Sequence, residues 1–212
     1  MTAAILDHLI VAASTLPQGV DYVAKLTGVT PRPGGKHVAM GTHNALLRLG
    51  DRVYLEVVAI DPDGVKPDRP RWFDLDDARL RAELTERPRL IAWAARTTDI
   101  DDAVARCPIA LGRVHPFARG EYRWRITIPD DGKRPADGIA PTLIQWDVAA
   151  HPADSLPDFG VALAGIAATH PDPDAIRGAL AALGLVSALG LTRDRHARLV
   201  ATLATPQGPV AL

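Results

Sequence analysis

The chain has 212 residues, of which 47% are hydrophobic and 23% charged, and its formal net charge is −1. This length allows one large domain or two small ones, while the near-neutral charge and scattered arginines argue against nucleic-acid binding. The single cysteine, Cys107, excludes an intrachain disulfide framework and a multi-cysteine zinc site. The sequence shows no signal-like segment and no apolar stretch long enough to span a membrane, so we expect a soluble, cytoplasmic protein.

The first 60 residues predict a strand, a helix and a hairpin. An apolar, β-branched run over 5–13 indicates a buried strand, and residues 15–28 carry the start signal, apolar stripe and final glycine of a helix. Residues 31–37, with two prolines and two glycines, are predicted to form a loop. Residues 41–59 alternate in two arms around a glycine turn, which predicts a β-hairpin.

The same order of elements starts again near residue 89. The second copy has a strand at 90–95, a helical stripe at 100–107, and strands at 121–128 and 142–148, and a short helix around 76–84 lies between the copies. The tail predicts a strand at 161–168, a helix at 174–183 and a terminal hairpin. We therefore expect an α+β fold, with two modules at about 4–60 and 89–150 in a domain spanning 1–152. Residues 153–212 would form an additional C-terminal αβ unit packed on that domain.

The hairpin contains the first indication of a functional site. Glu56 lies between apolar residues of its strand, where a carboxylate is costly to bury without a partner or a metal, and His43 lies on the neighbouring arm. Asp7 and His8 are adjacent on the first strand, so simple alternation predicts that they face opposite sides and form no dyad.

Several segments resemble the glyoxalase-like branch of the vicinal oxygen chelate superfamily. In the first half they are Leu6-Asp-His-Leu-Ile-Val-Ala12, Gly41-Thr-His-Asn-Ala-Leu-Leu-Arg-Leu-Gly50 and Tyr54-Leu-Glu-Val-Val58; in the second they are Ala92-Trp-Ala-Ala-Arg-Thr-Thr98, Tyr122-Arg-Trp-Arg-Ile126 and Leu143-Ile-Gln-Trp-Asp147. The resemblance covers about residues 4–152. It implies two βαβββ modules whose mixed and antiparallel sheets curl around a shared cavity.

The resemblance also implies a divalent metal held by the first and last strands of each module. By position, the first module offers His8 and Glu56, and the second offers Gln145 but no ligand at Leu90, the place that matches His8. Imidazole and carboxylate suit Zn, Fe, Mn or Ni, and His43 would complete a set of two histidines and one carboxylate if it faces the cavity. The metal can also be absent.

Other residues have weaker assignments. Arg123 and Arg125 share one strand face and could clamp a carboxylate or phosphate of a ligand, with a solvated outer face as the alternative. We expect Trp93 and Trp146 to fill the core. Four histidines in or near loops are expected at the surface: His115, His151, His170 and His196.

Three functions remain open. The leading one is a metal-dependent lyase, isomerase or ring-cleaving dioxygenase that acts on a small oxygenated metabolite, with Glu56 and His43 as catalytic candidates. The second is a metal-free protein that binds or sequesters a small molecule in the same cavity, with Gln145, Arg123 and Arg125 as ligand-binding candidates. The third is a structural or dimerisation module, and we count a homodimer as possible and membrane or nucleic-acid partners as absent.

Overall fold

The computed structural model describes residues 3–212, which contain four α-helices and twelve strands. The strands are β1 (Ile5–Ala12), β2 (Arg32–His37), β3 (Thr42–Gly50), β4 (Val53–Ile60), β5 (Arg89–Arg96), β6 (Arg113–Arg119), β7 (Tyr122–Ile128), β8 (Thr142–Trp146), β9 (Ala162–His170), β10 (Gly190–Arg193), β11 (Arg198–Thr205) and β12 (Gly208–Ala211). The helices are α1 (Leu16–Thr27), α2 (Ala78–Glu86), α3 (Ile100–Arg106) and α4 (Pro173–Ala182), with short 3₁₀ turns η1 (Val38–Met40), η2 (Pro135–Gly138) and η3 (Pro152–Ser155).

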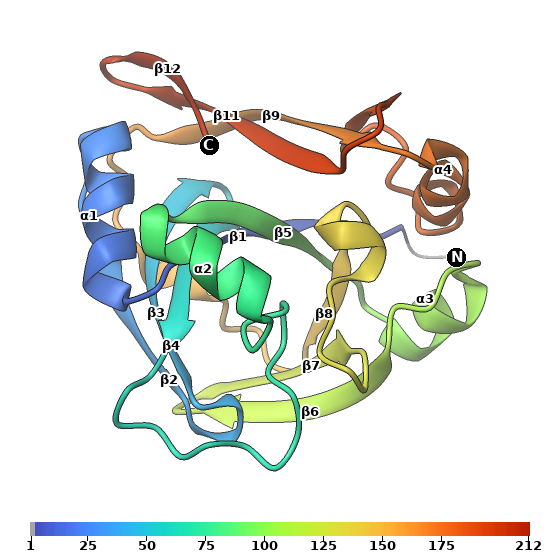
Figure 1. Cartoon of the computed structure of the whole chain (residues 1–212), viewed down its shortest axis with the longest axis horizontal. Helices are drawn as coiled ribbons and strands as arrows, with labels where there is room; N and C mark the ends of the chain where they lie inside the picture. Colours follow the sequence, from blue (N-terminus) through green and yellow to red (C-terminus); the bar gives the residue numbers. More distant parts are fainter. Residues whose placement is uncertain (1–2) are drawn as a thin grey trace.

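Two βαβββ modules form one curled sheet of eight strands, in the order β2-β3-β4-β1-β5-β8-β7-β6. The first strands of the modules, β1 and β5, pair antiparallel at the centre, and each also pairs in parallel with the last strand of its own module. Figure 1 shows the two modules curling away from this central pair. The predicted α+β fold with paired modules is therefore confirmed.

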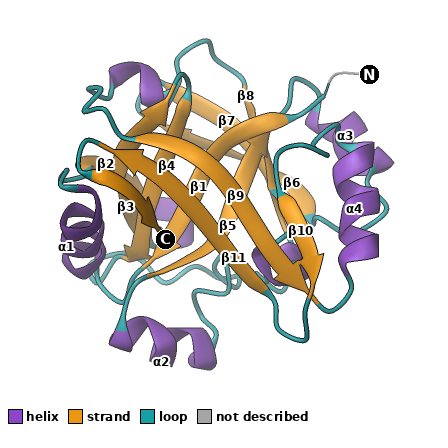
Figure 2. Ribbon diagram, turned by 90° about the horizontal axis from the view of Figure 1, so that it is seen from above, coloured by secondary structure: helices purple, strands orange, loops and turns teal. Residues whose placement is uncertain are grey.

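The convex face of this sheet is covered by a second sheet, with the order β10-β9-β11-β12. Alternate residues of β9 and β11, such as Ile166 and Leu203, pack with Leu9, Leu55 and Trp93 in one buried core. Figures 1 and 2 show β9 and β11 lying across β1 and β5, with α1 at one end and α4 at the other. The division of the chain into two structural units at residue 152 stays a prediction.

The concave face is covered by α2 and by residues 61–77, which we call the covering segment. It brings Trp72, Phe73 and Leu75 into a second buried cluster with Ile10 and Trp124 from the sheet. In Figure 1 the segment runs from the end of β4 past β2 and β6 before it reaches α2. The candidate site lies on this concave side.

The prediction that residues 31–37 form a loop is wrong, because Arg32–His37 pair with β3 as strand β2. β2 is an edge strand, so Pro33, which lacks an N–H donor, does not break an inner ladder. The glycines have a packing role: a Cβ on Gly34 would lie 2.2 Å from Asn44 Oδ1, and one on Gly35 would lie 3.0 Å from Arg119 Cδ. The glycine pair thus admits two polar side chains of the site.

Candidate functional site

A β-bulge in β1 places Asp7 beside His8. In the pairing of β1 with β5, Leu6 lies opposite Ala95 and His8 opposite Ala94, so Asp7 is the extra residue. The bulge cancels the expected alternation, and His8 Nδ1 lies 2.6 Å from Asp7 Oδ1. The expectation that these two residues form no dyad is therefore wrong, because the ladder is irregular at Asp7.

His8 also lies close to Glu56, as the resemblance implied. His8 Nε2 and Glu56 Oε2 are 3.8 Å apart, and the two side chains are 4% and 8% exposed. The ring of Tyr54, which neighbours His8 across the parallel β1–β4 pair, stacks on the imidazole with centroids 4.6 Å apart. A buried imidazole and a buried carboxylate thus face each other on adjacent strands.

Glu56 has further polar neighbours from the first module. Asn44 Nδ2 donates to Glu56 Oε1 at 2.6 Å, and His37 Nε2 lies 3.9 Å from the same oxygen. From the second module, Arg119 reaches across, with NH1 3.2 Å from His37 Nε2 and 3.3 Å from Asn44 Oδ1. Arg119 therefore brings a positive charge from β6 to the polar residues of β2 and β3.

Burial and hydrogen bonding set the charges of this cluster. Burial alone would raise the pKa of Asp7, but its hydrogen bonds with His151 and His8 outweigh that effect and hold the pKa well below its usual range. Burial lowers the pKa of His37 to about 4, against the opposing attraction of Glu56 and with help from the charge of Arg119. At neutral pH, Asp7 is a carboxylate and His37 is a neutral imidazole.

Aromatic side chains enclose the polar cluster. Seven of the ten aromatic residues of the chain gather here: Tyr54, Trp72, Phe73, Phe117, Tyr122, Trp124 and Trp146. Trp72 of the covering segment lies edge-on to His37 at 5.0 Å and against Phe117 at 5.5 Å. Its buried indole N–H has no acceptor among the described residues. The site therefore offers apolar walls and an unused donor beside its charged groups.

The structure does not bring His43 to this cluster. Asn44 points to Glu56, and the alternation of β3 places His43 on the other side, with Ala45 and Leu47 of the convex core. The hairpin thus carries Glu56 and His43 on neighbouring strands but on opposite faces.

The three ligand-binding candidates also lie outside the concave face. Gln145 Oε1 accepts from the backbone N–H of Ile100 at the start of α3. Arg125 pairs with Asp101 and Asp147, and Arg123 donates to the carbonyl of Gly120. Ile144 and Trp146 are the β8 residues that pack on the concave side.

The donors present do not fit the divalent metal that the resemblance implies. Within residues 3–212 no group of three or more His, Cys, Asp or Glu side chains could hold a metal ion. The β5 residues opposite His8 and Ile10 are Ala94 and Ala92. His37 Nε2 faces the guanidinium of Arg119, which occupies its lone pair. His8 and Glu56 remain as a pair of donors, too few for a site of three or four ligands.

Sequence reasoning missed four residues of the cluster: His37, Asn44, Arg119 and His151. His151, expected at the surface, is 1% exposed and lies 3.1 Å from Asp7 Oδ2 through Nε2. Only Asn44 had a local signal. In the hairpin it shares a strand face with Leu46, and Leu46 is the cross-strand partner of Glu56. The others depend on how distant segments pack.

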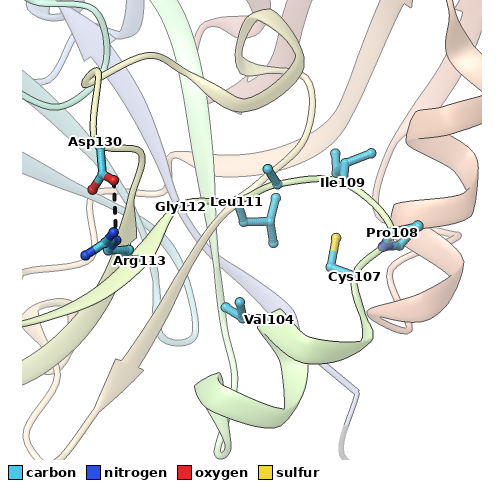
Figure 3. A pocket seen from close by; sticks show the side chains of 9 residues that line it. Val104, Cys107, Pro108, Ile109, Leu111, Gly112, Arg113 and Asp130 are labelled. Atoms are coloured by element: carbon cyan, nitrogen blue, oxygen red, sulfur yellow. Dashed lines mark ion pairs between the residues drawn. The ribbon is translucent and has the colours of Figure 1, made fainter.

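Two surface hollows lie away from the cluster. One of about 360 Å³ is bordered by the end of α3 and the start of β6; it includes Cys107 and the Arg113–Asp130 ion pair at 3.3 Å (Figure 3). Burial raises the pKa of the Cys107 thiol, which fits an unreactive residue. The other, of about 590 Å³, lies between α1 and Phe159. No predicted site residue lines either hollow.

In the described part of the chain, no helix is long and apolar enough to cross a membrane.

Comparison with solved structures shows the fold. A hypothetical protein from Staphylococcus aureus aligns over 98% of this chain and 84% of its own, with a TM-score of 0.57 and 12% identity. Methylmalonyl-CoA epimerase of Streptomyces coelicolor, in complex with 2-nitronate-propionyl-CoA, aligns over 71% of this chain and 99% of its own, with a TM-score of 0.44 and 18% identity. The Mycobacterium tuberculosis epimerase covers 68% and 88% of the two chains, with a TM-score of 0.40 and 18% identity.

A search among curated proteins found no match. The sequence profile of the glyoxalase-like domain matches residues 6–184. This match spans both βαβββ modules and extends through α4, and it confirms the resemblance stated from the strand motifs. The chain belongs to the glyoxalase-like domain family.

Proposed function

We propose that this protein is a metal-independent isomerase or lyase that moves a proton next to a carbonyl group of a small oxygenated metabolite. His8 and Glu56 serve as the proton-transferring pair, and Arg119 supplies the positive charge. The proposal keeps the predicted reaction class and replaces the metal by side chains. Ring-cleaving dioxygenase chemistry is left out, because the donors around His8 and Glu56 do not fit a metal site.

The observation that carries the proposal is the orientation of His8. Its Nδ1 is bound to the Asp7 carboxylate at 2.6 Å, and its Nε2 faces Glu56 at 3.8 Å. An ionised carboxylate only accepts hydrogen bonds, so the His8 proton sits on Nδ1 and the Nε2 lone pair faces the site. An aspartate behind an imidazole fixes the tautomer in the same way in serine hydrolases.

The proposed step is a proton transfer through an enolate. Glu56 accepts the proton from the carbon next to the carbonyl, and the electron pair of the broken C–H bond moves onto the carbonyl oxygen. Arg119 stabilises that negative charge in a site with few competing waters. Glu56 then passes this proton to the Nε2 lone pair of His8, 3.8 Å away, and His8 delivers it from Nε2 to carbon in an isomerisation or to the leaving group in a lyase.

Proton exchange tests this function without knowing the natural substrate. The protein, in D₂O with EDTA, is incubated with a panel of 2-oxo acids and hydroxyketones, and deuterium uptake at carbon is measured by mass spectrometry. We expect exchange on at least one compound, with a loss of about 100-fold or more in Glu56→Gln and in His8→Gln. Glu121→Gln, on an exposed turn, is the matched control.

Two results would overturn the proposal: exchange that survives in Glu56→Gln, or exchange that EDTA removes and a divalent metal restores. A panel compound that binds without exchange supports the second candidate, a binding or sequestering protein. The observation that favours this candidate is the cover of Trp72 and Phe73, which leaves His8 and Glu56 almost fully buried.

A further inference from the structure

We infer that His151 is a positioning residue, which acts through Asp7 to keep the Nε2 lone pair of His8 turned toward Glu56. This inference rests on the proposed function, although its main test does not require activity. His151 follows β8 and comes after both βαβββ modules in the chain. The site would then depend on a segment outside the two modules.

The local backbone fixes the ring of His151. The residue is the N-cap of η3: its Nδ1 accepts from the N–H of Ala153 at 3.3 Å, and its own N–H donates to Asp154 Oδ2 at 3.1 Å. Because Nδ1 is an acceptor here, the proton of the neutral ring is on Nε2. The ring also contacts Trp146 edge-on at 5.2 Å.

From this position His151 donates to the carboxylate that orients His8. Its Nε2 lies 3.1 Å from Asp7 Oδ2, and the indole N–H of Trp146 reaches the same oxygen at 3.1 Å. The other oxygen, Oδ1, then faces His8 Nδ1 at 2.6 Å. Asp7 is completely buried, so a lost donor would not be replaced by bulk water.

The order of contacts is thus His151, Asp7, His8, Glu56. His151 and Trp146 together hold Oδ2, with Arg96 NH1 3.6 Å from the same oxygen, so that Oδ1 faces His8. The hydrogen bond of His151 is the largest of the effects that keep Asp7 ionised against burial. An ionised Asp7 accepts a hydrogen bond from the Nδ1–H of His8. If the carboxylate rotates or is protonated, His8 is free to carry its proton on Nε2, and the lone pair no longer faces Glu56.

Two substitutions separate this role from a structural one. His151→Asn keeps the helix cap, because Asn is a strong N-cap residue, but its side chain is too short to reach Asp7. His151→Gln places an amide N–H near the position of the imidazole Nε2 and can still donate to Asp7. If His151 only caps η3, Asn should replace it better than Gln does. If His151 positions Asp7, Gln should replace it better than Asn does.

The readout is the tautomer of His8, taken from the ¹⁵N resonances of its ring and assigned with a His8→Gln variant. We expect the wild type and His151→Gln to hold the proton on Nδ1, and His151→Asn to shift the population toward the Nε2 form. Proton exchange on a responsive panel compound should fall about 10-fold to 100-fold in His151→Asn, as for other outer partners that orient an active-site imidazole. Thermal melting confirms that each variant is folded.

The inference is overturned if folded His151→Asn leaves the His8 tautomer unchanged, or if His151→Gln changes it as much as His151→Asn does. If neither variant folds, the ring ¹⁵N resonances of His151 in the wild type replace them: the inference requires its proton on Nε2, and a proton on Nδ1 contradicts the donation to Asp7. A changed tautomer in a protein that exchanges no protons would support the positioning role and reject the proposed function.

Discussion

At the scale of single residues, the site depends on one irregular position in a strand. Regular alternation would turn Asp7 to the convex side, away from His8. The bulge gives His8 a buried carboxylate partner at 2.6 Å, and this pairing sets which imidazole nitrogen faces Glu56. A second histidine of the cluster, His37, is kept neutral at neutral pH by its burial.

The burial of His37 predicts that the folded protein loses stability in acid. Its pKa falls from 6.5 to about 4 on folding, so the unfolded chain binds the proton first as pH decreases. Above pH 6.5 His37 is neutral in both states and does not change the free energy of unfolding. As pH falls to about 4, protonation of His37 in the unfolded chain lowers the free energy of unfolding by a total of about 3 kcal/mol. Urea unfolding at pH 7.5 and 4 should show a smaller loss in His37→Gln than in the wild type. His196→Gln, at an exposed position, should behave as the wild type does; equal losses in all three proteins would refute this account.

At the scale of elements, β2 shows how an edge strand serves the site. Gly34 and Gly35 have no side chains, and this leaves room for Asn44 and Arg119 to approach the strand. Asn44 in turn donates to Glu56. The strand therefore supports the carboxylate through a contact that any larger residue would block.

Gly34→Ala tests this contact. The new Cβ would lie 2.2 Å from Asn44 Oδ1, so Asn44 must move away from Glu56. We expect a loss of about 1–3 kcal/mol in the free energy of unfolding and a matching loss of proton exchange. Gly165→Ala in β9 is the matched control, because its Cβ meets nothing within 4 Å; it should be neutral or stabilising by up to about 1 kcal/mol. An equal effect of the two changes would contradict the packing role of Gly34.

The paired modules could be predicted from local patterns and the order of elements, and the His8–Glu56 pair was implied by the resemblance to a known family. β2 was missed because its prolines and glycines resemble a loop. Gln145 was placed by a weak repeat, and a strand shifted by one residue reverses its faces; Ile144 and Trp146 take the concave positions instead. Arg119 and His151 reach the site only through long-range packing, which no local pattern reports.

At the scale of the whole molecule, the C-terminal sheet completes the core. Leu203 of β11 is fully buried in the cluster that includes Leu9 and Trp93 of the central strands. The convex side of the eight-stranded sheet therefore has no separate core of its own. The concave side has the other large cluster, which the covering segment closes.

This shared core predicts cooperative unfolding. Leu203→Ala should cost about 2–5 kcal/mol and shift a single transition rather than create a second one. Tryptophan fluorescence, which reports on both clusters, and far-UV circular dichroism should give the same midpoint. Val186→Ala, at a side chain that is 68% exposed, should have little effect. Two separate transitions would show that residues 153–212 unfold independently.

The most direct test of the site is the ¹⁵N spectrum of the wild-type histidine rings, recorded with and without one equivalent of Zn²⁺. The account predicts that His8 holds its proton on Nδ1, facing Asp7, and that Zn²⁺ at this concentration leaves its resonances unchanged. A proton on Nε2, or a stoichiometric shift of His8 with Zn²⁺, would contradict it.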